Sequence, residues 1–361
     1  MRPTRALAEL GQSLWFDNIT RDLLDDGTLR RYVEEWSVTG LTSNPTIFDQ
    51  AFKNSRAYDA AIARRARAGE RGERLFFSLA IEDLSRAADL FRPVHERTAG
   101  VDGYVSLEVS PLLAYDTRAT IDAARALHAQ AGRPNLMIKI PGTPEGLPAI
   151  EEATFAGIPV NVTLLFSAEQ YVAAAEAYLR GIERRVAAGL RPDVASVASV
   201  FVSRWDVAVA GAVSADLRNR LGIAVCRRTY AAACSIFASP RWERAMNAGA
   251  RAQRLLWAST GTKDPSAPDT LYVEALAAPM TVDTMPEATL KAFFDHGRVG
   301  APMPRDGGDA EATIARVRAA GVDVDALATK LQQDGAKAFV KSWHDLIARV
   351  EAKTAELAGL A

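Results

Sequence analysis

The chain has 361 residues, of which 48% are apolar and 24% are charged, and its formal net charge at pH 7 is −1. These values are typical of a globular protein with a large core, and the absence of a basic block leaves nucleic-acid binding without electrostatic support. Two cysteines are too few for a disulfide framework. The sequence has no secretion signal at its amino terminus and no run of roughly 18–20 apolar residues that could span a bilayer. We therefore expect a soluble cytoplasmic protein with no membrane partner.

Short apolar strands alternate with helical segments along the whole chain. The eight candidate strands span residues 13–17, 37–45, 104–109, 135–143, 159–166, 195–204, 254–263 and 279–286. Periodicity predicts helices over 7–12, 20–26, 28–35, 74–95, 116–131, 145–156, 167–188 and 270–276, and within the longer helical intervals 46–103 and 206–251. Residues 287–361 are also predicted to be helical, apart from a loop rich in glycine and proline at 297–308.

Eight strands that alternate with helices predict an α/β fold, a single (β/α)8 barrel with additional helices. The main alternative is a doubly wound open sheet, but no glycine-rich turn follows the first strand, as a dinucleotide site would require. No repeat or linker divides the chain, so we expect one domain over residues 1–361, with a helical carboxyl-terminal segment from about residue 287. Those last helices could cover the mouth of the barrel or form a subunit contact.

Lys139 interrupts the apolar run of the fourth predicted strand. A charged lysine is costly to desolvate, and the ordinary explanation is that its side chain extends to water from the strand end. Only 8 of the 43 basic residues are lysines, however, so this chain would usually supply a generic cation as arginine. Lysine differs from arginine in having an amine that burial can release as a nucleophile at neutral pH. Lys139 is therefore a candidate catalytic residue.

Other polar side chains stand near the carboxyl ends of the predicted strands, where barrels carry out their chemistry. These residues are Asp17, Asn44, Glu108, Asn161, Thr163, Ser199, Arg204, Ser259 and Lys263. Each has an ordinary explanation as a helix cap, an ion-pair partner, a strand filler or a surface cation. Together they bring acids or bases, amides, hydroxyls and cations to one rim, which predicts imine chemistry on a phosphorylated ketone. The four histidines are scattered away from the strand ends, so we expect neither a metal nor another cofactor.

At these residues the sequence strongly resembles transaldolase, and the resemblance covers nearly the whole chain. It is carried by Leu-Trp-Phe-Asp-Asn-Ile at 14–19, Thr-Ser-Asn-Pro-Thr at 42–46, Ser-Leu-Glu-Val-Ser-Pro at 106–111, Met-Ile-Lys-Ile-Pro-Gly-Thr at 137–143, Asn-Val-Thr-Leu-Leu-Phe at 161–166 and Trp-Ala-Ser-Thr-Gly-Thr-Lys at 257–263. The resemblance implies a barrel that is circularly permuted relative to other class I aldolases, with the Schiff-base lysine on the fourth strand.

The resemblance also implies roles for individual residues. Lys139 would form the Schiff base with a dihydroxyacetone unit, and Asp17 would exchange a proton with the sugar C4 hydroxyl. Glu108, through a water held by Thr163, would serve imine formation and hydrolysis. The three-carbon unit would be held by Asn44, Asn161 and Ser199. The phosphate would be held by Arg204 and Ser259, with Lys263 as a second cation.

Transaldolases have a sister activity, fructose 6-phosphate aldolase, which is known for Gln where this chain has Glu108 and for Tyr where it has Phe201. The resemblance therefore favours transfer over simple cleavage. Val200, Ser203 and Lys263 differ from the Pro, Gly and Arg of other members, which suggests a separate bacterial-type branch.

The expected reaction is transfer from sedoheptulose 7-phosphate to glyceraldehyde 3-phosphate, giving erythrose 4-phosphate and fructose 6-phosphate in the pentose phosphate pathway. The enzyme would be a transferase that acts as a monomer or homodimer on sugar phosphates. A simple class I aldolase resembling fructose 6-phosphate aldolase, and a silent barrel that only binds sugar phosphates, are the alternatives.

Overall fold

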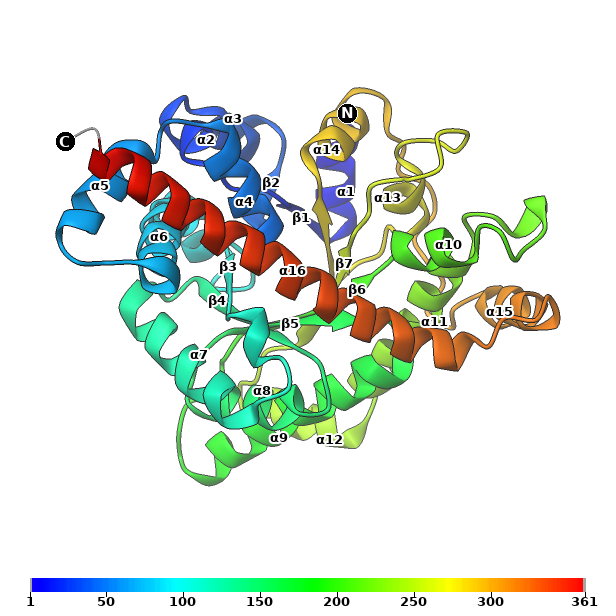
Figure 1. Ribbon diagram of the computed structural model, residues 1–361. Coiled ribbons are helices and arrows are strands. Elements are labelled where there is room, and N and C mark those ends of the chain that lie inside the picture. The colour runs from blue at the N-terminus through cyan, green and yellow to red at the C-terminus, as the bar shows by residue number, and fades with distance from the viewer. Residues whose placement is uncertain (1, 360–361) are drawn as a thin grey trace.

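Eight parallel strands close on themselves in chain order in the computed structural model, which describes residues 2–359 (Figure 1). The strands are β1 (Gln12–Phe16), β2 (Val38–Leu41), β3 (Val105–Glu108), β4 (Leu136–Pro141), β5 (Val160–Leu165), β6 (Ser196–Phe201), β7 (Gln253–Ala258) and β8 (Thr281–Met285). Pairing of β1 with β8 closes the sheet. All eight predicted strands are present, and the predicted barrel is confirmed.

Helices surround the barrel and follow the predicted segments closely. They are α1 (Pro3–Leu10), α2 (Arg21–Asp25), α3 (Thr28–Glu35), α4 (Pro45–Asn54), α5 (Asp59–Arg67), α6 (Gly72–Arg97), η1 (Pro111–Leu113), α7 (Thr117–Ala131), α8 (Gly146–Phe155), α9 (Ala168–Ala187), α10 (Ser203–Val209), η2 (Ala215–Leu217), α11 (Leu221–Phe237), α12 (Pro240–Asn247), α13 (Leu271–Ala275), α14 (Glu287–His296), α15 (Ala310–Ala319) and α16 (Val324–Gly359). Within residues 2–359 no single helix is long and apolar enough to cross a membrane, and one pair, bent by 64° between Phe237 and Pro240, passes by length and composition alone.

Several predicted boundaries were wrong. The second strand ends at Leu41 and not at residue 45, and the seventh ends at Ala258 and not at residue 263, so Asn44, Ser259 and Lys263 lie on the segments that follow these strands. Two other boundaries differ for local reasons. The first helix ends at Leu10 rather than at residue 12, because Gly11 adopts a left-handed conformation with φ 96° and caps it. The sixth strand ends at Phe201 and does not reach Arg204, because the backbone of Val202 already has the φ and ψ angles of a helix. Arg204 therefore projects from α10 and not from a strand.

Strand alternation decides which side chains face the inside of the barrel. Successive side chains of a strand point to opposite faces of the sheet, so those at alternate positions face the barrel interior and the others face the surrounding helices. On β4, Ile138 and Ile140 pack in the buried cluster that includes the surrounding helices α6 and α9, whereas Met137 belongs to a second cluster that includes Trp15 and Leu256 of other strands. Lys139 shares the parity of Met137 and so faces inward. The same alternation applies to the polar residues of β3, β5 and β6.

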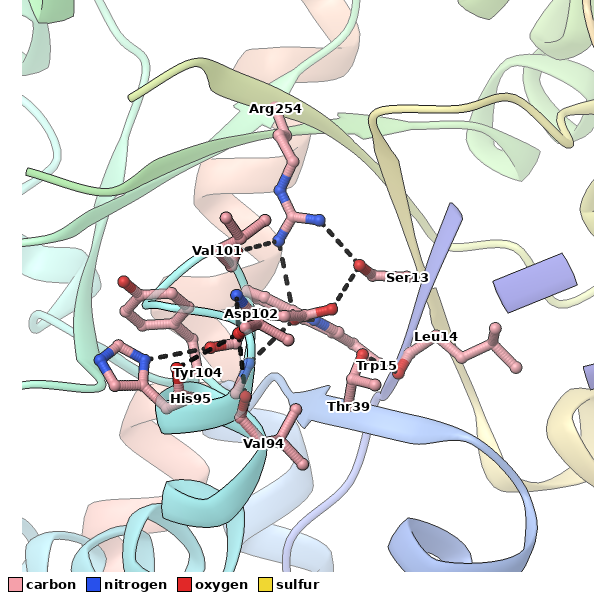
Figure 2. A network of polar contacts seen from close by, with 12 residues as sticks. Ser13, Leu14, Trp15, Thr39, Val94, His95, Val101, Asp102, Tyr104 and Arg254 are labelled. Carbon is pink, nitrogen blue, oxygen red and sulfur yellow. Dashed lines mark hydrogen bonds and ion pairs between the residues drawn. The ribbon is translucent and has the colours of Figure 1, made fainter. Parts of the chain in front are cut away.

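A buried polar network holds the amino-terminal ends of several strands together (Figure 2). Asp102, which precedes β3, accepts hydrogen bonds from Trp15 Nε1 at 2.8 Å and from the hydroxyl of Ser13. Arg254 of β7 donates to Ser13 Oγ at 2.7 Å and lies 3.6 Å from the same carboxylate. Because Asp102 and Arg254 are both buried, this network stabilises the end of the barrel opposite to the carboxyl ends of the strands.

The long helix α16 lies across the barrel, from the side of α5 to the side of α15 (Figure 1). Gln332 near its start donates hydrogen bonds to the carbonyl oxygens of Gly142 and Leu164, at the carboxyl ends of β4 and β5. Of the two positions that the sequence left open for the carboxyl-terminal helices, α16 thus occupies the mouth of the barrel. Residues 360 and 361 of the predicted helical segment lie outside the described residues.

Candidate active site

A cavity of about 330 Å³ opens at the carboxyl ends of the strands, next to α16. It is lined by nine of the eleven residues proposed from the sequence, namely Asp17, Asn44, Lys139, Thr163, Ser199, Phe201, Arg204, Ser259 and Lys263. The other two, Glu108 and Asn161, lie directly behind this wall and are hydrogen-bonded to residues of the lining. The fold thus brings the whole predicted set to one place.

Lys139 and Glu108 form a buried pair at the inner end of the cavity. The Nζ atom of Lys139 donates to Glu108 Oε2 at 3.0 Å and to the backbone oxygen of Ser43 at 3.3 Å. Lys139 is 5% exposed and Glu108 is 4% exposed, so the lysine does not extend into bulk water. This arrangement follows from the register of the sheet, in which position 108 of β3 pairs with position 139 of β4. A proton can pass directly between amine and carboxyl.

Two carboxyl groups at the inner end have perturbed acidities. Burial raises the pKa of Glu108 from its ordinary value, and the ammonium of Lys139 partly opposes that shift. Burial also raises the pKa of Asp17, against the lowering effects of the Thr42 hydrogen bond and of Lys139. The hydroxyl of Thr42 lies 2.7 Å from Asp17 Oδ1 and 2.7 Å from the hydroxyl of Thr284. Both carboxyl groups therefore release protons nearer to neutral pH than exposed carboxyl groups do.

Amides and hydroxyls form a second group on β5 and β6. The side chain of Asn161 accepts a hydrogen bond from Ser199 Oγ at 2.7 Å and donates to Ser106 Oγ at 3.1 Å. Asn161 is fully buried, so it fixes the orientation of Ser199, which lines the cavity. Thr163 Oγ1 and Glu108 Oε1 are also buried, and neither has a hydrogen-bond partner within residues 2–359. Buried polar atoms of this kind are usually satisfied by water or substrate.

Two positively charged side chains besides Lys139 line the cavity. The guanidinium of Arg204 lies 5.0 Å from the ring centre of Phe201, and within residues 2–359 it has no carboxylate at ion-pair distance. Lys263 is exposed on the loop after β7 and lines the same cavity. Ser259, at the start of that loop, has a left-handed φ of 59° and shares a hydrogen bond of 2.8 Å with Ser203. Two cations and a hydroxyl can bind an anion here.

Asn44 has a capping role in addition to its place in the cavity. Its side-chain oxygen accepts a hydrogen bond from the backbone N–H of Ile47 at 3.1 Å and so caps α4. The ordinary explanation considered for this residue is thus correct, and it is compatible with a position in the cavity wall.

Two further residues of the cavity are not among those proposed from the sequence. Phe339 of α16 lines it, with its ring 5.5 Å from Lys139 Nζ and 5.8 Å from the guanidinium carbon of Arg204. No local pattern in a helix reveals such a contact with two distant segments. Thr42 was within a motif noted for the resemblance, and its inward position after β2 could have identified it as a partner of Asp17.

Comparisons with known proteins show the family of the chain. The family model described as Transaldolase/Fructose-6-phosphate aldolase matches residues 14–350. A protein named Transaldolase from Thiobacillus denitrificans is 45% identical over 97% of this chain and 100% of its own length. One of the same name from Thermobifida fusca is 46% identical over 96% of this chain and 97% of its own. Transaldolase 2 from a Nostoc species is 40% identical, with 96% of each chain covered. The chain belongs to the transaldolase/fructose-6-phosphate aldolase family.

Proposed function

We propose that this protein is a transaldolase that moves a dihydroxyacetone unit from sedoheptulose 7-phosphate to glyceraldehyde 3-phosphate, giving erythrose 4-phosphate and fructose 6-phosphate. The observation that carries the proposal is the buried pair of Lys139 and Glu108, 3.0 Å apart, in a cavity that Arg204 and Lys263 also line. The pair supplies a nucleophilic amine, and the cations supply a phosphate site.

The first half of the reaction uses Lys139, Glu108 and Asp17. Glu108 accepts a proton from Nζ of Lys139, and the resulting amine adds to the ketose carbonyl, which then loses water to give a protonated imine. Asp17 takes the proton of the C4 hydroxyl as the C3–C4 bond breaks. The electrons of that bond move to the imine nitrogen, the aldehyde product leaves, and a three-carbon enamine stays on Lys139.

The second half reverses these steps with a new aldehyde. The enamine carbon attacks the acceptor, Asp17 returns its proton to the new hydroxyl, and water hydrolyses the imine. The unpaired oxygens of Thr163 and Glu108 support a role for both in holding that water. Asn44, Asn161 and Ser199 would bind the hydroxyls of the three-carbon unit. Arg204, Ser259 and Lys263 would bind the phosphate, and Phe201 would support Arg204.

The proposal extends to the state of the protein in the cell. The chain would act as one barrel domain over residues 1–361, as a monomer or homodimer in the cytoplasm, within the pentose phosphate pathway. It would need no metal or other cofactor, because the imine itself accepts the electrons of the broken bond.

Borohydride reduction in the presence of fructose 6-phosphate tests the central step. We expect one added three-carbon unit at Lys139, located by peptide mass mapping. Lys139→Arg keeps the positive charge but should abolish the adduct, whereas Lys337→Arg, at an exposed position of α16, is the matched control and should keep it. An adduct on another lysine, or none, would refute the mechanism.

Omitting the acceptor aldehyde separates transfer from simple cleavage. A transaldolase keeps the three-carbon unit on Lys139 and turns over slowly under these conditions. A simple aldolase would continue to release dihydroxyacetone at the full rate, and that result would favour the fructose 6-phosphate aldolase reaction.

A further inference from the structure

One face of α16 packs against the segments that form the cavity, and Phe339 on this face lines the cavity itself. Gln332, Gly335 and Phe339 follow one another at spacings of three and four residues, so they lie on the same side of the helix. All three contact segments that carry proposed site residues. These contacts hold this face of α16 in place against the barrel.

Gln332 attaches α16 to the carboxyl ends of two strands. Its side-chain nitrogen donates to the backbone oxygen of Gly142 at 3.0 Å and to that of Leu164 at 2.9 Å. These two carbonyls follow Lys139 on β4 and Thr163 on β5. Because both N–H donors of the amide are used and the side chain is buried, α16 is held at two strands at once.

Gly335 gives Arg204 room next to the helix. A Cβ atom at position 335 would lie 2.9 Å from Leu164 Cδ2 and 3.1 Å from Arg204 Nη1, closer than ordinary van der Waals contact. Glycine is among the poorest helix formers, so its place inside α16 needs a reason. The close approach of the Leu164 side chain and of the Arg204 guanidinium supplies that reason.

The ring of Phe339 contacts the guanidinium of Arg204 as well. The guanidinium carbon of Arg204 lies 5.0 Å from the centre of the Phe201 ring and 5.8 Å from the centre of the Phe339 ring. Both distances fall within the range of cation–π attraction. Across residues 2–359 no acidic side chain forms an ion pair with Arg204, and the two rings flank its guanidinium.

We infer that α16 selects phosphorylated sugars, with Gly335 and Phe339 acting as positioning residues that hold the Arg204 guanidinium against the substrate phosphate. This inference rests on the proposed function. The carboxyl-terminal helix would thus contribute to substrate specificity. It would act by positioning Arg204, and not by contacting the reacting carbon atoms.

Gly335→Ala is the sharpest test, because the two atoms that the new methyl group would crowd, Leu164 Cδ2 and Arg204 Nη1, are the ends of flexible side chains. The KM for fructose 6-phosphate should rise about tenfold, the loss expected for one displaced hydrogen bond to a charged group, with kcat within about twofold. The KM for unphosphorylated fructose should not change. Gly300→Ala is the control, since a Cβ there meets no atom within 4 Å, and both KM values should stay unchanged.

Phe339→Leu gives a second test that keeps an apolar wall. The KM for fructose 6-phosphate should rise about two- to fivefold, as loss of one cation–π contact predicts, and Phe339→Tyr should restore most of the difference. Thermal melting of each variant checks that the barrel is folded.

A titration with inorganic phosphate measures the same effect without turnover. Gly335→Ala should weaken phosphate binding about tenfold relative to the Gly300→Ala control, the same loss of one charged hydrogen bond. Equal changes for phosphorylated and unphosphorylated sugars, or unchanged phosphate binding in folded Gly335→Ala, would overturn the inference. Absence of a borohydride adduct in the unaltered protein would instead refute the proposed function, and the phosphate titration would still decide the role of α16.

Discussion

Replacing Lys139 by methionine separates the structural cost of the buried amine from its chemistry. The substitution keeps an unbranched chain of similar length but leaves Glu108, which is 4% exposed, without its charged partner. Breaking a buried pair in this way costs about 3–5 kcal/mol. For 361 residues with an unfolding entropy of about 2.1 cal/mol/K per residue, the melting temperature falls about 1.3 °C per kcal/mol, or about 4–7 °C in total.

The double variant Lys139→Met/Glu108→Leu should recover this loss. It removes both charges, and apolar replacement of a buried pair is often neutral or stabilising by about 1–4 kcal/mol. The double variant should therefore melt at or above the temperature of the unaltered protein, although it has no catalytic amine. The two single substitutions and the double one form a thermodynamic cycle, measured by calorimetric melting.

The cost of Lys139→Met should also depend on pH. Burial raises the pKa of Glu108 above 4.5, and the substitution removes the ammonium that opposes this shift. The folded variant then keeps a proton that the unfolded chain has already released. Its stability should therefore fall as the pH rises from about 4.5 through the folded-state pKa, and its deficit should be greatest above that pKa. A deficit that does not grow with pH, or a double variant as unstable as the single one, would refute this reasoning.

Carboxyl groups inside and outside the cavity give three further expectations. Asp17→Ala should retain the borohydride adduct but slow C–C cleavage by about 10²–10⁴, as expected for loss of general base catalysis, and full turnover would contradict this role. Burial raises the pKa of Asp17 above 3.8, and Asp17 must be unprotonated to act as the base, so kcat/KM should fall as the pH drops through that raised pKa. A pH–rate profile whose acid limb lies at or below pH 3.8 would contradict this expectation. Asp102→Ala removes the acceptor of Ser13 and Trp15 and the partner of Arg254, so the melting temperature should fall by at least about 4 °C with KM unchanged. A changed KM without a change in melting temperature would contradict this structural role.

The barrel could be predicted because its strands carry a strong local signal. Each is a short apolar run bounded by turn residues, and the helices between them have the expected periodicity. Lys139 was conspicuous for the same reason, since a charge within such a run is unusual. The inward position of Asn161, Thr163 and Ser199 also follows from alternation along β5 and β6. Local patterns therefore located most of the cavity wall.

The contribution of α16 could not be predicted, because it depends on where a distant helix lies. Phe339 is separated by 200 residues in the chain from Lys139, and an apolar residue in an amphipathic helix is normally read as core. Gly335 likewise resembles an ordinary helix-weakening residue until Arg204 is seen beside it. The sequence predicts Arg204 at the end of a strand, because the helical turn at Val202 has no signal in the local sequence.

Structural and functional explanations of one residue are often treated as alternatives, and Asn44 argues against that practice. It caps α4 through Ile47 and lines the cavity at the same time. In a (β/α)8 barrel the helix that follows a strand begins at the rim where the chemistry takes place, so a capping residue is already near the substrate. An ordinary role for a polar residue at a strand end thus does not count against a catalytic or binding one. The more informative evidence is whether several such residues, here from Asp17 to Lys263, reach one cavity.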